Sequence, residues 1–260
     1  MLPDLLSVGP ITFHTYGLFA AAGFVAGLVL TLKIGRSSGI GGHLLAEMAV
    51  YMIPAAIAGS RALYVMMNFG YFSDHLSDIL KIWQGGLVFQ GGLIAVMLTL
   101  FWYVKGHGLS FWDMGDLWAP AAALGQAIGW VGCLMAGCGF GKPTGSFFGI
   151  VFTNPHSLAP VGIPLYPTQI FAAAGGLGLT FVLVRILAKK QFAGQVLLWY
   201  LILHSTISLF IEKYRGDEPA ALLYDTMSVI QGLSLVILAW AVISLFILKS
   251  RGRPTGDIER

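Results

Sequence analysis

Seven stretches of about 20 apolar residues run through this chain and limit the class of structure that it can form. A helix of that length crosses the hydrocarbon core of a bilayer, because each residue advances the helix by about 1.5 Å. We expect the spans at about residues 14–34, 45–67, 86–104, 116–137, 168–188, 194–212 and 227–248. The predicted fold class is therefore an all-α membrane protein with seven transmembrane helices.

The composition supports this class and excludes an ordinary soluble domain. Hydrophobic residues make up 57% of the chain and charged residues 10%, with a mean hydropathy of +0.79, whereas soluble domains carry about 25% charged residues. We expect one polytopic domain over residues 1–260. Residues 1–13 lack a charged segment and a cleavage site, so the first span is expected to be retained and not to be a removed signal peptide.

The basic residues predict how the spans are oriented. When alternate connections are taken together, ten of the fifteen Lys and Arg residues fall on one side, and such an excess marks the cytoplasm. The N-terminus is then expected outside the cell and the C-terminus in the cytoplasm. The ten are Lys33, Arg36, Lys105, Arg185, Lys189, Lys190, Lys249, Arg251, Arg253 and Arg260. This asymmetry explains the net charge of +3, which gives no indication of nucleic-acid binding.

Two of the predicted outer connections, at about 68–85 and 138–167, are long enough to have an ordered structure. The second is rich in Gly, Pro and aromatic residues, which predicts a small external cap with short strands or turns. The predicted cytoplasmic connections are short and basic. We therefore expect the chemistry in the outer half of the membrane or just above it.

The stretch from Gly129 to Thr144 combines several glycines and two cysteines with a polar exit. Glycine permits unusual dihedrals and close backbone approach, which fits either the wall of an intramembrane cavity or a tight helix crossing. Cys133 and Cys138 are five apart, which places them roughly 140° apart on a helix and disfavours a disulfide or a two-ligand metal site. They are predicted to be small packing residues, and no metal site is expected.

Charged residues inside a span are costly and are candidates for function. Arg61 lies near the outer end of the second span, and Glu212 and Arg215 lie near the outer end of the sixth. Glu212 and Arg215 are three residues apart and can pair on one helix face. The structural alternatives are that Arg61 extends to lipid headgroups and that Glu212 and Arg215 form only a helix-end ion pair.

Two uncharged or weakly basic side chains add to this set. Gln90 is flanked by pairs of glycines, whose backbone can supply the partners that a buried amide needs. His204 and Ser208 are one helical turn apart, so His204 is either a packing residue or part of a polar face. Together with the arginines they predict an electropositive cavity open to outer-leaflet lipid. Arginine binds phosphate in a bidentate manner, so the predicted ligand is a phospholipid headgroup.

The order and spacing of several motifs resemble the phosphatidylglycerol–prolipoprotein diacylglyceryl transferases of bacterial inner membranes, along nearly the whole chain. None of these motifs is specific alone. The matching segments are His14-Thr15-Tyr16-Gly17-Leu18, Gly59 to Tyr64, Trp83 to Ile94, Tyr166-Pro167-Thr168-Gln169-Ile170-Phe171, Glu212 with Arg215, and Ser228 to Ser234.

The resemblance implies a transferase that moves the diacylglyceryl group of phosphatidylglycerol to the thiol of a lipobox cysteine and releases glycerol 1-phosphate. It implies a multi-pass protein of the bacterial inner membrane, without a cofactor. Its partners would be phosphatidylglycerol and a prolipoprotein signal peptide or another membrane protein, and not nucleic acid. The implied catalytic residues are His204, Tyr16 and Glu212, and the implied substrate-binding residues are Arg61, Arg215, Gln90, Gln169, Gly91, Gly92 and Gly137.

The resemblance also assigns roles. Arg61 and Arg215 would bind the phosphate, Glu212 would orient Arg215, and His204 with Tyr16 would prepare the acceptor thiol. The thiol must become a thiolate, and the departing phosphate needs cationic donors.

The chain departs from the family pattern at several positions that carry this chemistry. Family residues are replaced by Gln90 (His), Trp130 (Arg), Cys133 (Asn), Cys138 (Glu), Ala172 (Glu), His204 (Tyr) and Ser208 (Arg). Losing one positioned donor costs about 10²–10³ in rate. Three functions therefore stay open: the family reaction, a divergent lipid transferase with another acceptor or donor, and a phospholipid-binding membrane subunit without catalysis.

Overall fold

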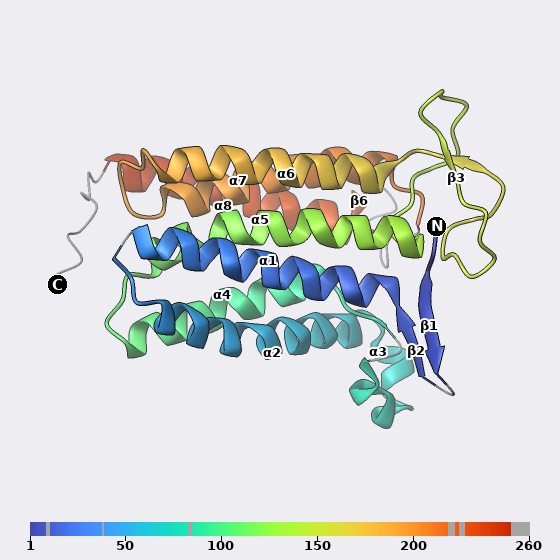
Figure 1. Ribbon diagram of the computed structural model, residues 1–260, viewed down its shortest axis with the longest axis horizontal. Helices are drawn as coiled ribbons and strands as arrows, with labels where there is room; N and C mark the ends of the chain where they lie inside the picture. The colour runs from blue at the N-terminus through green and yellow to red at the C-terminus, as the bar shows by residue number, and fades with distance from the viewer. Residues whose placement is uncertain (9–10, 38, 83–84, 218–221, 224–226, 251–260) are drawn as a thin grey trace. The chain divides into compact units, whose positions relative to one another are not determined.

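The computed structural model describes residues 1–8, 11–37, 39–82, 85–217, 222–223 and 227–250. Within these residues, seven helices are long and apolar enough to cross a membrane (Figure 1). They are α1 (Thr15–Ser37), α2 (Gly42–Met67), α4 (Phe89–Gly106), α5 (Phe111–Ala136), α6 (Thr168–Leu187), α7 (Gln195–Tyr214) and α8 (Val229–Ser250). The seven predicted spans are confirmed, and most of their bounds agree to within three residues.

Only the start of α5 differs by more than three residues, and the starts of α5 and α4 both have local reasons. Helix α5 begins at Phe111 because the Ser110 side chain precedes it and accepts a hydrogen bond from the backbone of Asp113 (3.3 Å). Helix α4 begins only at Phe89, after two glycines with positive φ angles, Gly85 (86°) and Gly86 (75°). Left-handed backbone at these glycines cannot continue a right-handed helix.

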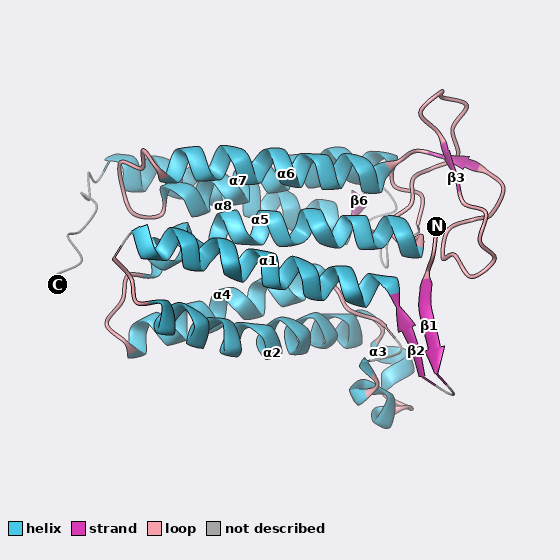
Figure 2. Ribbon diagram, viewed as in Figure 1, coloured by secondary structure: helices cyan, strands magenta, loops and turns pink. Residues whose placement is uncertain are grey.

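Short elements join the helices, as the secondary-structure view in Figure 2 shows. A hairpin of β1 (Asp4–Val8) and β2 (Ile11–His14), where the sequence indicated no element, precedes α1. The predicted cap at 138–167 contains the expected short strands, β3 (Ile150–Val151) and β4 (Pro164–Leu165), around a small core of Phe152, Ala159 and Leu165. The remaining elements are α3 (Phe69–Phe72), η1 (Leu76–Leu80), β5 (Leu222–Leu223) and β6 (Met227–Ser228).

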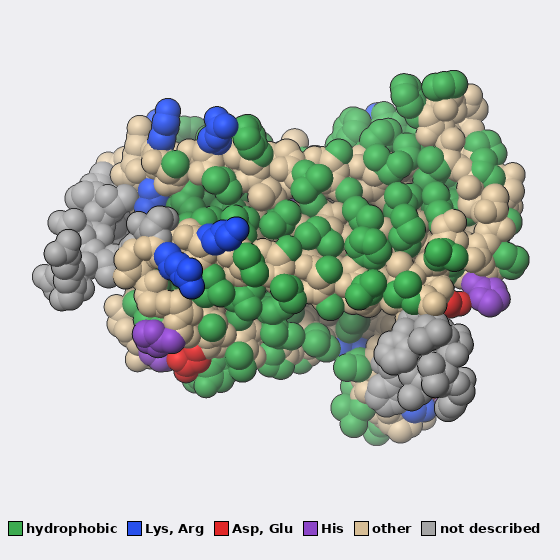
Figure 3. All heavy atoms as spheres, viewed as in Figure 1, with side chains coloured by type: hydrophobic (Ala, Val, Ile, Leu, Met, Phe, Trp, Pro, Cys, Tyr) green, Lys and Arg blue, Asp and Glu red, His purple; other side chains and the backbone are tan. Residues whose placement is uncertain are grey.

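The chain forms two compact units. The larger unit consists of Met1–Thr31 and Asp116–Arg260, and the smaller unit of Leu32–Gly115. On the face shown in Figure 3, hydrophobic side chains cover the middle of the larger unit, and Lys and Arg side chains lie near the end of α6. Phe181 and Phe210 are 60% and 58% exposed. Exposed aromatic side chains of this size on apolar helices are those of a multi-pass membrane protein.

In the larger unit, α1 crosses α5 at small residues. A side chain at Gly23 would lie 2.7 Å from the carbonyl oxygen of Gly125, and one at Gly132 would lie 2.8 Å from Cβ of Phe19. Small residues at these positions let the two backbones approach closely. A tight helix crossing therefore explains Gly132, one of the glycines in the stretch that the sequence left open between a crossing and a cavity wall.

A buried carboxylate fixes the start of α7 in the same unit. Asp116 is fully buried and accepts hydrogen bonds from the backbone of Gly194 (2.8 Å), Val196 (2.8 Å) and Leu197 (2.9 Å). These are among the backbone donors that a helix leaves without partners at its N-terminus. Asp116 thereby joins α5 to α7 and sets the position from which α7 carries its polar residues.

The smaller unit is built on the pair α2 and α4. A side chain at Gly59 would lie 2.5 Å from the carbonyl oxygen of Gly91, and one at Gly92 would lie 2.4 Å from Oγ of Ser60. The two helices therefore touch through backbone at these glycines. The Tyr103 hydroxyl also donates a hydrogen bond to Glu47 (3.0 Å).

Candidate functional site

The predicted site residues fall in both units. Arg61, Gln90, Gly91 and Gly92 belong to the smaller unit, and Tyr16, Gly137, Gln169, His204, Glu212 and Arg215 belong to the larger unit.

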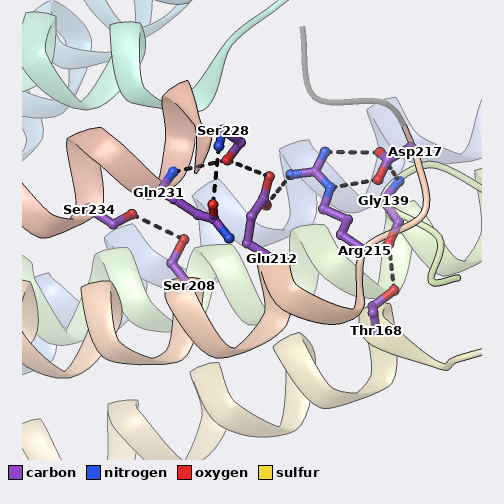
Figure 4. A network of polar contacts seen from close by, with 9 residues as sticks. All are labelled: Gly139, Thr168, Ser208, Glu212, Arg215, Asp217, Ser228, Gln231 and Ser234. Carbon is purple, nitrogen blue, oxygen red and sulfur yellow. Dashed lines mark hydrogen bonds and ion pairs between the residues drawn. The ribbon is translucent and has the colours of Figure 1, made fainter. Parts of the chain in front are cut away.

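Arg215, in the larger unit, is the centre of a polar network at the end of α7 (Figure 4). Its guanidinium binds Asp217 in a bidentate manner, with Nε to Oδ1 at 2.7 Å and Nη2 to Oδ2 at 2.9 Å. Its Nη1 donates to Oε2 of Glu212 at 3.2 Å. The predicted pair of Glu212 and Arg215 is confirmed. Asp217 was not predicted, although it follows Arg215 by only two residues in the sequence.

The network continues to the first turn of α8. Oε1 of Glu212 accepts a hydrogen bond from the Ser228 hydroxyl at 3.0 Å. Ser228 and Gln231 form a capping box, in which each side chain bonds the other's backbone N–H at 3.1 Å. This explains physically why the family-like Ser228–Ser234 motif has a Ser and a Gln three residues apart. It also joins the ends of α7 and α8.

We predict that Ser228→Ala destabilises the protein by about 1–2 kcal/mol, because it removes a helix cap and a partner of Glu212. Thermal unfolding in detergent micelles measures the change. Thr206→Ala is the matched control, since that exposed hydroxyl bonds Ile202 within its own helix. Equal melting temperatures for Ser228→Ala and the control would contradict the assignment.

The network also reaches the turn after α5. Oδ2 of Asp217 accepts a hydrogen bond from the backbone of Gly139 (3.1 Å), whose carbonyl accepts one from the Thr168 hydroxyl (2.7 Å). Nε2 of Gln169 donates to the carbonyl of Cys138 at 3.0 Å, and Gln169 is fully buried. Thr168 and Gln169, the first residues of α6, therefore fix the turn after α5, and the amide of Gly139 in that turn binds Asp217.

The charges of this network differ from the sequence expectation. One guanidinium faces two carboxylates, so these three groups do not make the electropositive cavity that the sequence predicted. Burial acts to lower the pKa of Arg215, but the hydrogen bonds and charges of Asp217 and Glu212 outweigh it and raise that pKa. Arg215 is therefore protonated at every physiological pH, and it is held in one orientation.

Gly137 ends α5 and turns the chain. Its φ angle is +88°, and a side chain there would lie 2.2 Å from Oγ of Ser157 and 2.9 Å from the backbone nitrogen of Ala159. Because the helix ends at Ala136, the helical estimate that separated Cys133 from Cys138 was wrong. The turn brings the Cys133 and Cys138 thiols close enough to influence one another's ionisation. The spacing of the two cysteines could not reveal this proximity, because an angle estimated from helical spacing applies only within a helix.

The two remaining candidates of the larger unit lie elsewhere on α1 and α7. Tyr16, in the first turn of α1, is 43% exposed. His204 stacks on Tyr200, with ring centroids 5.5 Å apart and planes 13° apart, and the Tyr200 hydroxyl donates to Gln126 at 3.1 Å. Their roles in catalysis stay predictions.

Arg61, in the smaller unit, is buried and binds the backbone of the connection between α2 and α4. Its guanidinium donates to the carbonyls of Ile79 (2.9 Å), Asp78 (2.6 Å), Gly85 (2.7 Å) and Gly86 (3.1 Å). With 7% exposure it does not extend to lipid headgroups, which excludes that alternative. Arg61 and two of these partners, Asp78 and Gly85, line a cavity of about 300 Å³, whose other walls are Tyr64, Asn68, Tyr71 and Phe72.

The other candidates of the smaller unit lie at the start of α4. Gly91 and Gly92 face α2, so the helix crossing accounts for both. Gln90 is half-buried in the first turn. The backbone of Val88 donates to the carbonyl of Ser60 at 3.1 Å, which fixes the position of this turn.

The connection held by Arg61 also contains a carboxylate that titrates in acid. Asp78 accepts hydrogen bonds from Lys81 (2.6 Å) and Tyr71 (2.8 Å), which lower its pKa from 3.8 to about 2. Its ionised form therefore stabilises the folded connection above about pH 4, and this contribution is lost as the pH falls toward 2.

We predict that amide hydrogen exchange in 76–82 accelerates between pH 4 and pH 2 beyond the intrinsic pH effect. Asp78→Asn should remove that pH dependence. The exposed Asp74→Asn is the control, and an Asp78→Asn profile that follows the wild type would contradict the prediction.

Among the described residues, no group of three or more His, Cys, Asp or Glu side chains could hold a metal ion. The chemistry of the site is that of a guanidinium, carboxylates, hydroxyls and thiols at the ends of apolar helices.

Fold and site together define a polytopic helical membrane protein with a half-buried ionic network at a helix end. The family model of prolipoprotein diacylglyceryl transferase matches residues 3–247, and the chain belongs to that family. The chain is 31% identical over 258 residues to the phosphatidylglycerol–prolipoprotein diacylglyceryl transferase of Bacillus licheniformis, covering 96% of this chain and 94% of that protein. It is 31% identical over 238 residues to the enzyme of the same name from Finegoldia magna (91% and 92% covered). The Thermosynechococcus vestitus enzyme is 30% identical over 258 residues (97% and 94% covered).

Proposed function

We propose that this protein transfers the diacylglyceryl group of phosphatidylglycerol to the thiol of a prolipoprotein cysteine. The observation that carries the proposal is the family match over residues 3–247, which includes the whole Arg215 network. The relatives are named for this reaction and are similar along more than nine-tenths of the chain. We place the protein in the bacterial inner membrane, with the N-terminus outside and the Lys- and Arg-rich connections in the cytoplasm.

Arg215 is the group of the larger unit best suited to bind the phosphate. The three bonds described above use three of the five N–H donors of its guanidinium. Its side chain is 25% exposed, and the remaining two donors have no partner among the described residues. Asp217 and Glu212 hold the guanidinium in one orientation, and a preoriented donor stabilises the charge that develops on a departing phosphate.

The acceptor thiol must lose its proton before its sulfur attacks the glycerol carbon and the carbon–oxygen bond to phosphate breaks. We assign His204, assisted by Tyr16, to this proton, as the sequence resemblance implies. His204, Ser208 and Glu212 follow at four-residue intervals on one face of α7, so a base at His204 would lie on the face that carries the Glu212–Arg215 pair. Gln169 and Gly137 serve the proposed site by holding the turn at 137–139.

The charge of the network also supports a second candidate. Two carboxylates beside the single arginine are unfavourable for phosphate, and Gln90 stands where the family has a histidine. The alternatives are a lipid transferase with another acceptor, or a phospholipid-binding membrane subunit without catalysis.

The test is a transfer assay with the full chain in detergent micelles, phosphatidylglycerol and a lipobox peptide. The expected result is a mass increase on the peptide that requires its cysteine, with a Cys→Ser peptide as the control. His204→Gln should lower the rate and flatten its pH profile. No transfer, with phosphatidylglycerol still bound to the purified protein, would favour the second candidate.

A further inference from the structure

The two cysteines of the chain meet at the end of α5, beside the Arg215 network. Cys133 lies in the last turn of the helix, and Cys138 is the second residue after it. Gly137, in the left-handed conformation, donates its N–H to the carbonyl of Cys133 at 2.7 Å, which is the hydrogen bond of a glycine helix end. Such an end folds the next side chain back over the last helical turn, and here both side chains are thiols.

Both thiols are free and half-buried, and the turn after Ala136 brings them close together. The pKa of Cys138 is lowered, chiefly because the Cys133 thiol donates a hydrogen bond to it; the charge of Arg215 adds to this shift, whereas burial and the charge of Asp217 oppose it. The thiolate is the form that attacks a disulfide, so Cys138 is the better nucleophile of the pair. The peptide group that follows Cys138 is held at both of its polar atoms, by Gln169 on the carbonyl of Cys138 and by Asp217 on the amide of Gly139.

We infer that Cys133 and Cys138 are a reversible dithiol–disulfide site. The oxidant is a small or protein disulfide, such as glutathione disulfide. The Cys138 thiolate attacks one of its sulfurs and displaces one thiolate, which leaves a mixed disulfide on Cys138. The Cys133 thiol then loses its proton, attacks the Cys138 sulfur and displaces the second thiolate. One disulfide forms in the protein, the oxidant is reduced to two thiols, and the two protons go to solvent or to the released thiolates.

The position of the pair gives the oxidation a structural consequence. Cys138 and Gly139 are consecutive, and Gly139 binds the carboxylate that holds Arg215. A disulfide across the turn fixes residues 137–139 and therefore stabilises the Asp217–Arg215 contact against opening of the turn. The inference does not depend on the transferase reaction, because the pair and its contacts belong to the protein itself.

The experiment equilibrates the full chain in detergent micelles with mixtures of reduced and oxidised glutathione, then alkylates the remaining thiols and measures masses. We expect the wild type to lose both alkylation sites together and about 2 Da, without forming dimers. Cys133→Ser should trap glutathione on Cys138, with a gain of about 305 Da. The melting temperature of the wild type should rise on oxidation, and that of Cys133→Ser/Cys138→Ser should not change.

Two results would overturn the inference. In the first, the Cys133→Ser variant takes up glutathione while both wild-type thiols remain open to alkylation, which shows that the thiols are reached but do not pair. In the second, neither the variant nor the wild type reacts with glutathione disulfide, which shows that no disulfide oxidant reaches Cys138.

Discussion

Replacing Arg215 by Ala is expected to lower the free energy of unfolding by about 2–4 kcal/mol. The substitution leaves the carboxylates of Glu212 and Asp217 without their cation, and breaking a buried ion pair costs about 3–5 kcal/mol. The lower range applies because the Arg215 side chain is one-quarter exposed, so water screens part of the charge. Thermal unfolding in detergent micelles measures the effect.

The transfer rate of Arg215→Ala is expected to fall by about 10²-fold or more, since the phosphate loses its positioned donor. Arg215→Lys separates the two effects, because it keeps the charge and loses the bidentate geometry. Arg185→Ala is the matched control: that guanidinium lies over the Phe181 ring at 4.4 Å, outside the network. The loss of unfolding free energy in Arg215→Ala/Asp217→Asn should be smaller than the sum of the losses in the two single variants, since each single change leaves a charged partner unpaired. An Arg215→Ala protein with unchanged melting temperature and rate would contradict both assignments.

Replacing Arg61 by Ala is expected to open the connection that follows α2. Arg61 donates four hydrogen bonds to backbone carbonyls, and hydrogen bonds to a charged group contribute about 1.5–3 kcal/mol each. These contributions are not additive, and we expect a loss of about 3 kcal/mol or more. Hydrogen exchange in 76–82 and 85–91 should accelerate strongly in Arg61→Ala, whereas the same segments in Lys105→Ala should exchange as in the wild type.

The exchange experiment also decides how a loss of transfer in Arg61→Ala is interpreted. The sequence assigned Arg61 to the phosphate, but its contacts with four carbonyls use four of its five donors. Faster exchange together with slower transfer indicates that Arg61 acts by holding the connection. Unchanged exchange with weaker phosphatidylglycerol binding would instead make Arg61 a direct ligand, and unchanged transfer would remove it from the site.

Several site features could be predicted because they depend on local geometry. Glu212 and Arg215 are three residues apart on one helix, and this spacing alone places their side chains on one face. The Ser228 and Gln231 pair has the spacing of a capping box and could have been found in the same way. Asp217 lies beyond the helix end, where no periodicity places a side chain, and the sequence analysis missed it.

Other features depend on segments distant in the sequence. The partners of Arg61 come from 17 to 25 residues further along the chain, and Gln169 reaches a carbonyl 31 residues before it. Sequence reasoning recognised these side chains as costly to bury, and therefore as candidates for function. It could not distinguish a ligand from the protein's own backbone, because both satisfy the same donors.

By itself, the sequence determined the seven membrane-spanning helices and the family. Burial of about 20 consecutive apolar residues in a bilayer leaves few alternatives to a helix, since each backbone group must find its partner within the segment. Only the tertiary structure decided which groups the polar side chains bind and how the two thiols meet. Those contacts depend on where helices end and chains turn: one glycine with a φ of +88° ends α5 and changes the relation of Cys133 to Cys138. Helical periodicity holds only within a helix, and the site of this protein lies where its helices stop.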